Sequence, residues 1–342
     1  MSAGSLSDHN LKELLSHVYL PLSKKVPVFG PKRRVIVIAG PTGAGKTKLS
    51  LDIAKALHGE IISADSMQIY RGMDIGTAKA SADDQKAVPH HLIDIADVEQ
   101  DYNVKRYFEE ASSALRLISA KGKVPIIVGG SGFYIQALLY GPPPGPPSDP
   151  EVRARLEGQM DSIGCEAMYE QLQMLDPDYA KTITEKDRHK VIRALEIMTL
   201  SEKKVSDFQL PTKMRNDEYD FRLWFLHYPR EILYSKIEER CDQMVENGLV
   251  EEVKEMIQRG LLENSSASSA IGYKQTLAYL KSEGKEEDYR EFIYEFKKSS
   301  RRYAKRQFTW FRKERFFRPL DLSQIDEKHA QEIIMQDYEQ GH

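Results

Sequence analysis

Cysteine is scarce in this sequence, since its 342 residues include only Cys165 and Cys241. Two cysteines far apart in the chain cannot form a disulfide framework or a Cys-rich zinc module, so we expect two reduced thiols in a reducing compartment. Long apolar segments are missing too, because no stretch reaches the roughly 18 residues that a membrane-spanning helix requires. Residues 1–34 lack the apolar centre of a secretory signal and the Arg-rich, acid-poor composition of a transit peptide. The sequence therefore predicts a cytoplasmic protein without a membrane partner.

An excess of charge of one sign is absent from the chain as a whole, whose formal net charge is −3. This balance excludes a global nucleic-acid-binding signature, yet the charge is unevenly distributed. Residues 297–318 contain ten Lys or Arg, one acidic residue and six interleaved aromatic residues. Such a segment can follow a phosphate backbone and stack bases, or it can be an amphipathic helix whose charges face solvent. The spacing alone leaves both interpretations open.

A complete phosphate-binding loop, with the pattern Gly-x4-Gly-Lys-Thr, follows the apolar run Val35–Ala39. Its residues are Gly40, Pro41, Thr42, Gly43, Ala44, Gly45, Lys46 and Thr47. A strand that leads through a Gly-rich turn into a helix directs backbone N–H groups and a helix N-terminus at one point, which favours an anion there. Lys46 adds a mobile positive charge, and the hydroxyl of Thr47 can ligate Mg²⁺. We predict a diphosphate or triphosphate site with Mg²⁺ as its cofactor.

Apolar strand-like segments alternate with helical patterns in the first third of the chain. Strands are expected at Val35–Ala39, Glu60–Ala64, His91–Ile95, Val124–Val128 and, further on, Phe221–His227. Helices are expected at Lys46–Leu57, Val104–Ala120, Phe133–Leu139, Pro150–Gln159, Glu166–Leu175, Lys186–Leu200, Arg230–Asn247, Leu249–Gln258 and Glu287–Arg306. The alternation predicts an α/β fold, a P-loop NTPase-like parallel sheet flanked by helices. Ligands of such sheets bind at the carboxyl ends of the strands.

A proline-rich stretch at residues 141–147 separates this pattern from a purely helical region. Neither a helix nor a central strand tolerates so many prolines, so we expect a stiff linker. The sequence therefore predicts a helical insertion domain at residues 145–215, within a P-loop core domain formed by residues 33–144 and 216–320. An N-terminal extension (residues 1–32, with a short helix near residues 11–20) and a polar tail (residues 321–342) complete the expected organisation. We expect a monomer without an obligate protein partner.

Two of the expected strands end beside the phosphate loop in residues that suit chemistry. Asp65 follows the strand that ends at Ala64, and a carboxylate there can hold Mg²⁺, orient a nucleophile or accept a proton, or it can cap a helix. The strand Val124–Val128 ends in Gly129-Gly130-Ser131-Gly132 and not in the metal-positioning Asp that is usual in ATPases. That turn supplies backbone donors and one hydroxyl for a second set of anionic oxygens. The residue chemistry by itself predicts phosphoryl or diphosphate transfer.

For three further polar residues near these strands, the sequence gives less support for a functional role. Asp94 could replace the missing acid or could equally cap a turn. His90 and His91 lack companions with metal-ligand spacing, so we interpret both as structural.

Several short motifs follow one another in a fixed order along the chain. Besides the phosphate loop they are Ser63-Ala64-Asp65-Ser66-Met67-Gln68-Ile69-Tyr70, Met73-Asp74-Ile75-Gly76-Thr77-Ala78-Lys79, Val88-Pro89-His90-His91, Val128-Gly129-Gly130-Ser131-Gly132, Asp149-Pro150-Glu151-Val152-Arg153, Arg193-Ala194-Leu195-Glu196, Ile271-Gly272-Tyr273-Lys274-Gln275 and Lys305-Arg306-Gln307-Phe308-Thr309-Trp310-Phe311. In this order they resemble the tRNA dimethylallyltransferases (tRNA isopentenyltransferases) of the bacterial type. The resemblance extends over roughly residues 33–318.

The resemblance implies that a dimethylallyl group passes from dimethylallyl diphosphate to N6 of adenosine 37, beside the tRNA anticodon, while diphosphate leaves. Asp65 then matches the family's general base, which takes a proton from a poorly nucleophilic amine. Lys46 and Thr47, with Mg²⁺ and the loop amides, would neutralise the departing diphosphate. Ser131 stands where the family usually has Thr, and Arg240 matches the family arginine that holds the diphosphate. Spacing alone would make Arg240 a solvated helix residue.

The same resemblance implies a tRNA site that receives an extruded base. Its expected residues are Asp65, Ser66, Met67, Gln68, Ser131, Arg153, His189, Lys190, Val191, Ile192, Arg193, Ala270, Ile271, Gly272, Tyr273, Lys274 and Gln275. The helical insertion would hold the anticodon stem-loop. The resemblance also favours an RNA-facing function for the basic segment at residues 297–318.

Three alternatives stay open at this point. An adenylate isopentenyltransferase, which prenylates free AMP, ADP or ATP, shares the Gly-Gly-Ser turn, although the insertion and the Gly-Tyr-Lys-Gln segment favour tRNA. A P-loop kinase or ATPase fits the loop but not the turn that replaces its acid. A catalytically silent tRNA-binding protein has no reason to keep Lys46, Thr47, Asp65 and Arg240 together.

Overall fold

The computed structural model describes residues 32–208, 214 and 218–340. Residues 33–342 form one unit that holds every described helix and strand. The short helix expected near residues 11–20 lies outside the described residues, as does the predicted end of the insertion at residue 215. Within the described ranges, every helix is too short or too polar to serve as a membrane span.

The centre of this unit is a six-stranded parallel sheet with the strand order β3-β2-β4-β1-β5-β6. The strands are β1 (Arg33–Ala39), β2 (Glu60–Ser63), β3 (His90–His91), β4 (Pro125–Gly129), β5 (Tyr219–His227) and β6 (Arg318–Asp321). Residues Val35–Ala39 of the central strand β1 are completely buried. A parallel strand covered on both faces needs apolar side chains in both directions, which explains this uninterrupted run. The predicted α/β fold is confirmed.

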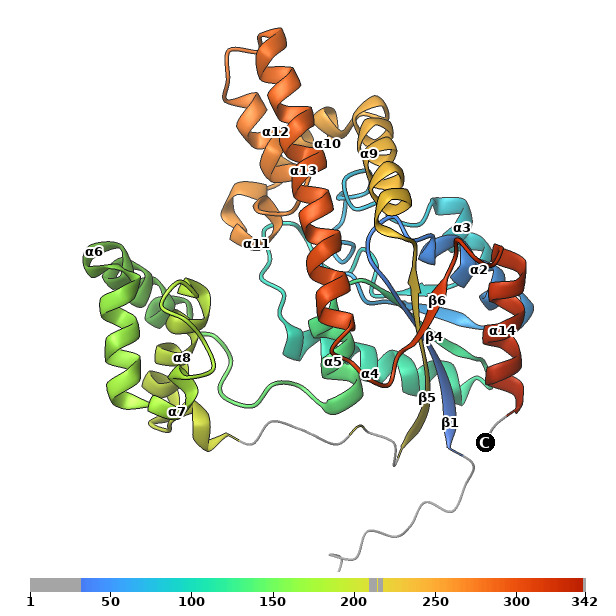
Figure 1. The fold of residues 1–342 in the computed structure, drawn as a ribbon, viewed down its shortest axis with the longest axis horizontal. Helices are drawn as coiled ribbons and strands as arrows, with labels where there is room; N and C mark the ends of the chain where they lie inside the picture. Colours follow the sequence, from blue (N-terminus) through green and yellow to red (C-terminus); the bar gives the residue numbers. More distant parts are fainter. Residues whose placement is uncertain (1–31, 209–213, 215–217, 341–342) are drawn as a thin grey trace, which may run out of the picture. The chain divides into compact units, whose positions relative to one another are not determined.

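Helices cover both faces of the sheet (Figure 1). They are α2 (Lys46–Ala56), α3 (Ala82–Ala87), α4 (Val104–Ala120), α5 (Gly132–Tyr140), α6 (Pro150–Leu175), α7 (Pro177–Ala180), α8 (Arg188–Ser201), α9 (Arg230–Glu246), α10 (Leu249–Gln258), α11 (Ser265–Ser268), α12 (Tyr273–Leu280), α13 (Glu286–Phe311) and α14 (Glu327–Gln340), with short 3₁₀ turns at Val205–Asp207 and Leu261–Glu263. Side chains of β1 alternate between the faces. Val35 and Val37 belong to a core shared with α4 and α5, whereas Ile36 and Ile38 belong to one shared with α2 and α14.

The third predicted strand is shorter than expected. The sequence predicts a strand at His91–Ile95, but β3 ends at His91. Leu92 and Asp94 have positive φ angles of 62° and 55°, which no strand can accommodate. The chain therefore leaves the sheet after two residues, and Asp94 forms an ion pair with Lys79 at 2.6 Å.

Helices α6, α7 and α8 build a hydrophobic core of their own. Its buried residues are Leu156, Met160, Met168, Leu172, Ala180, Ile183, Val191, Ile192, Ala194 and Leu195. The two helices expected at Pro150–Gln159 and Glu166–Leu175 are joined in α6, where the non-helical Gly164 has φ 85°. A separate core favours the predicted helical insertion, whose boundaries stay a prediction.

A third core lies among α9, α10, α11, α12 and α13 and includes the loop that follows β2. Ile69, Tyr70 and Met73 of that loop pack in the same cluster as Leu233 of α9 and Phe296 of α13. Figure 1 shows α9 continuing directly from β5, so these helices gather at the carboxyl ends of the strands. This is the edge at which parallel sheets bind their ligands.

The segment that the sequence analysis treats as a polar tail is part of the core. Strand β6 pairs with β5, and α14 buries Ala330 and Ile334 completely in the cluster that contains α2. Asp337 of α14 pairs with Arg222 of β5 at 3.3 Å and also with Arg318. The three- and four-residue spacing of Ala330, Ile333, Ile334 and Tyr338 was the sequence signal for this helix.

Candidate active site

The phosphate loop has the left-handed backbone conformation that its glycines permit. Gly43 and Gly45 have φ angles of 80° and 82°, and Gly45 is the N-cap of α2. A Cβ on Gly40 would lie 2.5 Å from the carbonyl oxygen of Leu226 in β5. The Nζ of Lys46 donates to the carbonyl of Pro41 at 2.8 Å, so the ammonium is folded back over its own loop.

Asp65 lies at the end of β2, where the neighbouring strand β4 also ends. One of its carboxylate oxygens accepts the N–H of Met67 at 2.9 Å, which fixes the side chain at the start of the following loop. The N–H of Ser66 donates to the Oγ of Ser131 at 3.1 Å and links this loop to the turn after β4. The predicted base and the predicted hydroxyl are therefore parts of one hydrogen-bonded structure.

The turn after β4 approaches its neighbours too closely for larger residues. A Cβ on Gly129 would lie 2.1 Å from the carbonyl oxygen of Ala64, and a Cβ on Gly132 would lie 2.5 Å from the ring of Trp310 in α13. Its glycines thus let α13 pack directly onto the turn that carries Ser131.

A cavity of about 350 Å³ opens between the phosphate loop, the ends of β2 and β4, and the helices α9, α12 and α13. Its walls are formed by Thr42, Lys46, Thr47, Asp65, Ser66, Met67, Gln68, Gly76, Thr77, Ala78, Val128, Gly129, Gly130, Ile237, Arg240, Cys241, Met244, Ser266, Ser269, Ala270, Ile271, Tyr273, Phe296, Ser300, Tyr303, Arg306 and Gln307. Three of these side chains are cationic and one, Asp65, is anionic. The cavity therefore has an excess of positive charge, which suits an anionic ligand.

Lys46 and Arg240, the two cations that interact with Asp65, are both destabilised in their charged forms by burial. Burial of the ammonium and, to a smaller extent, the neighbouring Arg240 lower the pKa of Lys46 to about 7, while Asp65 acts in the opposite direction. The residue keeps some exposure to the cavity, but its charged end lies deep. Burial also lowers the pKa of Arg240 from its ordinary value. A negatively charged ligand between these groups would relieve both effects.

The structure brings several of the predicted site residues together in the cavity and leaves others outside it. Lys46, Thr47, Asp65 and Arg240, taken from segments far apart in the chain, line the same cavity. The predicted tRNA-site residues that also line it are Ser66, Met67, Gln68, Ala270, Ile271 and Tyr273. Those that do not line it are Ser131, Arg153, His189, Lys190, Val191, Ile192, Arg193, Gly272, Lys274 and Gln275.

The insertion residues of that prediction differ in exposure. Val191 and Ile192 are buried in the core of the insertion, so their side chains pack against its helices. His189 and Lys190 are exposed. Arg193 donates to the carbonyl of Pro146 at 2.5 Å and therefore contacts the proline-rich linker.

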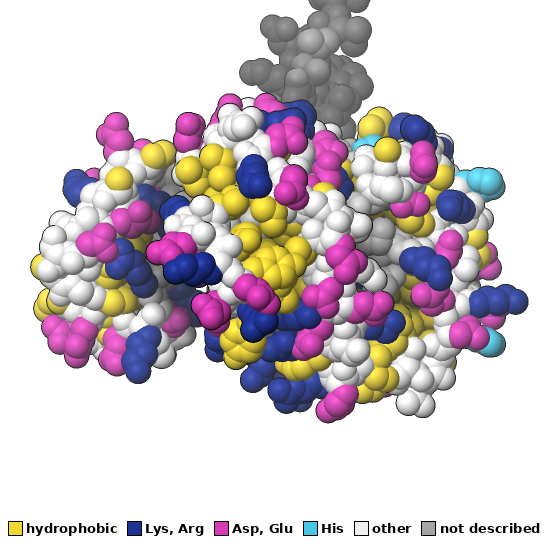
Figure 2. All heavy atoms as spheres, turned by 90° about the horizontal axis from the view of Figure 1, so that it is seen from above, with side chains coloured by type: hydrophobic (Ala, Val, Ile, Leu, Met, Phe, Trp, Pro, Cys, Tyr) yellow, Lys and Arg dark blue, Asp and Glu magenta, His cyan; other side chains and the backbone are white. Residues whose placement is uncertain are grey.

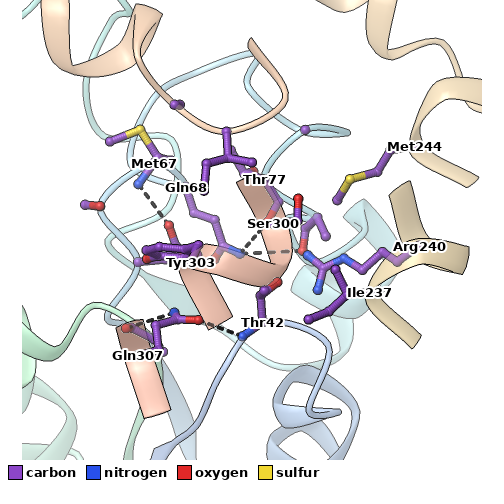
Figure 3. A pocket seen from close by; sticks show the side chains of 18 of the residues that line it. Thr42, Met67, Gln68, Thr77, Ile237, Arg240, Met244, Ser300, Tyr303 and Gln307 are labelled. Carbon is purple, nitrogen blue, oxygen red and sulfur yellow. Dashed lines mark hydrogen bonds between the residues drawn. The ribbon is translucent and has the colours of Figure 1, made fainter. Parts of the chain in front are cut away.

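Helix α13 contributes site residues that the sequence analysis did not single out. Ser300, Tyr303 and Gln307 project from one face of this helix into the cavity (Figure 3). Burial raises the pKa of Tyr303, and the nearby Asp65 raises it further, so its phenol stays protonated. The spacing of three and four residues was visible in the sequence, but it was hidden among basic residues.

Glu252 of α10 is a second residue that sequence reasoning missed. Its buried carboxylate accepts three consecutive backbone N–H groups, those of Asp74 at 3.0 Å, Ile75 at 2.6 Å and Gly76 at 3.0 Å. The hydroxyl of Tyr273 donates to the same carboxylate. Glu252 thereby joins the two wall segments that contain Gly76 and Tyr273.

Metal ligands are few in this part of the chain. Among the described residues, no group of three or more His, Cys, Asp or Glu could hold a metal ion. His91 contacts the carboxylate of Glu60 at 2.7 Å and His90 contacts the carbonyl of Val88 at 2.7 Å, in agreement with structural roles. The exposed hydroxyl of Thr47 fits Mg²⁺, which commonly takes few protein ligands and completes its shell with phosphate oxygens and water.

Comparison with known proteins points to the same chemistry. Residues 68–314 match the family model described as IPP transferase. A tRNA dimethylallyltransferase of Protochlamydia amoebophila is 52% identical over 337 residues, which are 98% of this chain and 98% of that protein.

Two solved structures share the fold as well as the sequence. A full-length tRNA isopentenylpyrophosphate transferase from Bacillus halodurans is 38% identical, with a TM-score of 0.65 over 90% of this chain and 98% of that one. A eukaryotic dimethylallyltransferase acting on tRNA is 29% identical, with a TM-score of 0.74 over 88% of this chain and 78% of that one. The chain therefore belongs to the tRNA dimethylallyltransferases, a family of prenyl-transferring enzymes.

Proposed function

We propose that this enzyme transfers the dimethylallyl group of dimethylallyl diphosphate to N6 of adenosine 37 in the tRNA anticodon loop. The products are N6-isopentenyladenosine and diphosphate. One observation carries the proposal: a single cavity holds the phosphate loop and two partly buried cations beside one carboxylate, Asp65. A diphosphate and a proton acceptor are the two requirements of this displacement.

The cationic part of the cavity binds and activates the leaving group. Lys46 and Arg240 stabilise the negative charge that develops on the diphosphate when the allylic C–O bond breaks. The amides of the phosphate loop and the N-terminus of α2 add fixed dipoles of the same sense. Mg²⁺ bound at Thr47 would supply further neutralisation of the phosphate oxygens.

Asp65 acts on the acceptor, the N6 amine of the adenosine. The N6 lone pair forms the new N–C bond to the allylic carbon, and the electron pair of the broken C–O bond leaves with the diphosphate. The proton lost from N6 passes to the carboxylate of Asp65, which acts as general base. Ser131, bonded to the N–H of Ser66, positions the loop that carries Asp65.

The RNA contacts are assigned to residues beside the cavity, to the insertion and to exposed cations of residues 297–318. We assign the acceptor channel to Met67, Gln68 and the segment Ala270–Gln275, and the grip on the anticodon stem-loop to the insertion, with Arg153, His189, Lys190 and Arg193. Exposed cations of residues 297–318 would contact phosphates, namely Arg302, Lys305, Arg306, Arg312, Lys313 and Arg315. Figure 2 shows basic and acidic side chains interspersed over the face seen from above, so no uniform basic field covers that face. Binding of RNA must then depend on local groups.

The alternatives are less well supported. The relatives that cover this chain almost completely are named for tRNA, which does not favour an adenylate isopentenyltransferase. A P-loop ATPase is disfavoured because β4 leads into glycines where an acid would hold the metal. We further propose that the enzyme works in the cytoplasm as a monomer.

Incubation with dimethylallyl diphosphate and Mg²⁺, with either an unmodified anticodon stem-loop or AMP as acceptor, tests the proposal. Nucleoside mass spectrometry should detect N6-isopentenyladenosine at position 37 of the stem-loop, and little prenylated AMP. Efficient prenylation of AMP with inert RNA would establish the adenylate enzyme instead. Turnover of ATP without prenyl transfer would favour the ATPase.

A further inference from the structure

Gln307 of α13 connects two parts of the site that lie far apart in the sequence. Its side-chain Oε1 accepts the backbone N–H of Thr42 in the phosphate loop at 2.9 Å. Its Nε2 donates to the carbonyl of Gly130, in the turn after β4, at 3.0 Å. Both bonds are drawn in Figure 3, and only one orientation of the amide satisfies them together. The side chain is 7% exposed, so both bonds are shielded from water.

The surrounding backbone is built around this amide. A Cβ on Gly130 would lie 2.2 Å from Nε2 of Gln307, so a larger residue at this position would displace the amide from its two hydrogen bonds. The N–H of Thr42 is satisfied by Gln307, which fixes the entry to the phosphate loop before any ligand binds. Without Gln307, a backbone donor and a backbone acceptor would lose their partners in a poorly hydrated place.

The same helix also reaches the acceptor side. Tyr303, one turn before Gln307, lines the same cavity close to Ser131 and Gln307, and Gly130, which accepts from Gln307, directly precedes Ser131 in the chain. Ser131 in turn accepts the N–H of Ser66, next to Asp65. A continuous set of contacts thus runs from the phosphate loop through Gln307 to the loop of the proposed base.

We propose that Gln307 is a positioning residue that couples the phosphate loop to the acceptor turn, so that diphosphate and RNA influence each other's binding. Gln307 sets the distance between the cationic part of the cavity and Asp65, which in-line displacement requires. The coupling must be reciprocal: a change in diphosphate affinity caused by RNA equals the change in RNA affinity caused by diphosphate. The inference rests on the proposed function for the identity of the two ligands.

We call the two hydrogen bonds of Gln307, to Thr42 and to Gly130, the bridge. Two variants distinguish loss of the bridge from loss of the fold. Gln307→Met keeps the length of the side chain and removes both bonds. Gly130→Ala reaches the same contact from the opposite side, since its Cβ displaces the amide. Thr309→Ala, an exposed position on α13, is the matched control. Thermal melts followed by circular dichroism identify the temperature at which all variants are folded.

The experiment measures the dissociation constant of inorganic pyrophosphate, in the presence of Mg²⁺, with and without an unmodified anticodon stem-loop. In the wild type we expect the two values to differ at least threefold, and in Gln307→Met their ratio should approach one. Prenyl transfer by Gln307→Met should show a kcat about 10- to 100-fold lower, as loss of two bonds to buried groups implies, and Thr309→Ala should match the wild type. Gly130→Ala should reproduce the loss of coupling.

Two results would overturn the inference. One is that folded Gln307→Met and folded Gly130→Ala both show the wild-type ratio of pyrophosphate dissociation constants with and without the stem-loop. The other is a lower melting temperature with unchanged kcat, KM and coupling, which would make Gln307 merely structural. Failure of the proposed function looks different, because the wild type itself would then prenylate no RNA while the pyrophosphate measurements still report on the bridge.

Discussion

The ammonium of Lys46 allows a sharp test of the electrostatics of the cavity. Its pKa is lowered to about 7 by burial and by Arg240, against the opposing effect of Asp65. A bound diphosphate would place several negative charges beside it and raise the pKa again. Binding should therefore take up a proton wherever the free lysine is neutral. We predict that affinity for dimethylallyl diphosphate decreases as pH rises above 7.

The number of protons taken up on binding is set by the pKa of Lys46 in the ligand-free enzyme. With a pKa of about 7, Lys46 is about 90% neutral at pH 8, so binding should take up about 0.9 proton per site at that pH and about 0.1 at pH 6. If the bound pKa lies well above 9, the affinity falls about 50-fold between pH 7 and pH 9. The ligand is not the cause, because a terminal phosphate with a second pKa of about 6 is already ionised in this range.

Isothermal titration calorimetry measures the proton directly. Dimethylallyl diphosphate is titrated into the RNA-free enzyme at pH 8 in buffers of different ionisation enthalpy. The slope of the observed enthalpy against the buffer enthalpy is the number of protons taken up. Lys46→Arg is the control, since a guanidinium stays charged over this range and should give a slope close to zero.

A wild-type slope near zero at pH 8 would refute the reasoning, because Lys46 would then be charged before the ligand arrives. Equal slopes in the wild type and in Lys46→Arg would assign the proton to another group. Either result would remove the buried, partly neutral lysine from the account of diphosphate binding.

Three further predictions concern catalysis and stability. Asp65→Asn should lower kcat by about 10²- to 10⁴-fold in single-turnover assays while the affinity for tRNA persists, and near-normal turnover would dismiss Asp65 as the base. Gly129→Ala should lower the free energy of unfolding by about 2–4 kcal/mol in urea titrations, because its Cβ meets backbone, whereas Gly158→Ala in α6 meets nothing within 4 Å and should be neutral or stabilising. Ile334→Ala, fully buried in α14, should cost about 2–5 kcal/mol in the same assay, and its neighbour Ile333→Ala, 37% exposed, much less; equal costs would contradict the packing of α14.

Much of the fold could be predicted because the signals were local. The run Val35–Ala39 is apolar at every position, which only a strand buried on both faces requires, and the phosphate loop after it leads into a helix. The short β3 could not be predicted, because the positive φ angles at Leu92 and Asp94 arise from tertiary contacts such as the ion pair to Lys79. Asp tolerates a positive φ, but Leu rarely adopts one, so the residue type of Leu92 did not indicate this conformation.

The site residues that lie in sequence motifs could be predicted, and those outside motifs could not. Lys46, Thr47 and Asp65 stand at the ends of strands, where chemistry is expected, and the structure brings them to one cavity. Arg240 was accessible only through family resemblance, since nothing in its helical surroundings distinguishes it from a solvated arginine. Glu252 gave no signal, because an acid in an amphipathic helix is ordinary until three amides converge on it.

Helix α13 resolves the ambiguity of the basic and aromatic segment. Its sequence admits two interpretations, a nucleic-acid surface or an amphipathic helix, and the structure shows that the second is true without excluding the first. One face carries Tyr303 and Gln307 to the cavity and Phe311 to the core. The opposite face exposes cations such as Arg302 and Lys305. Because one rigid helix holds both sets, a phosphate bound on the outside would also constrain the bridge on the inside, which is the physical basis for expecting RNA and diphosphate to bind cooperatively.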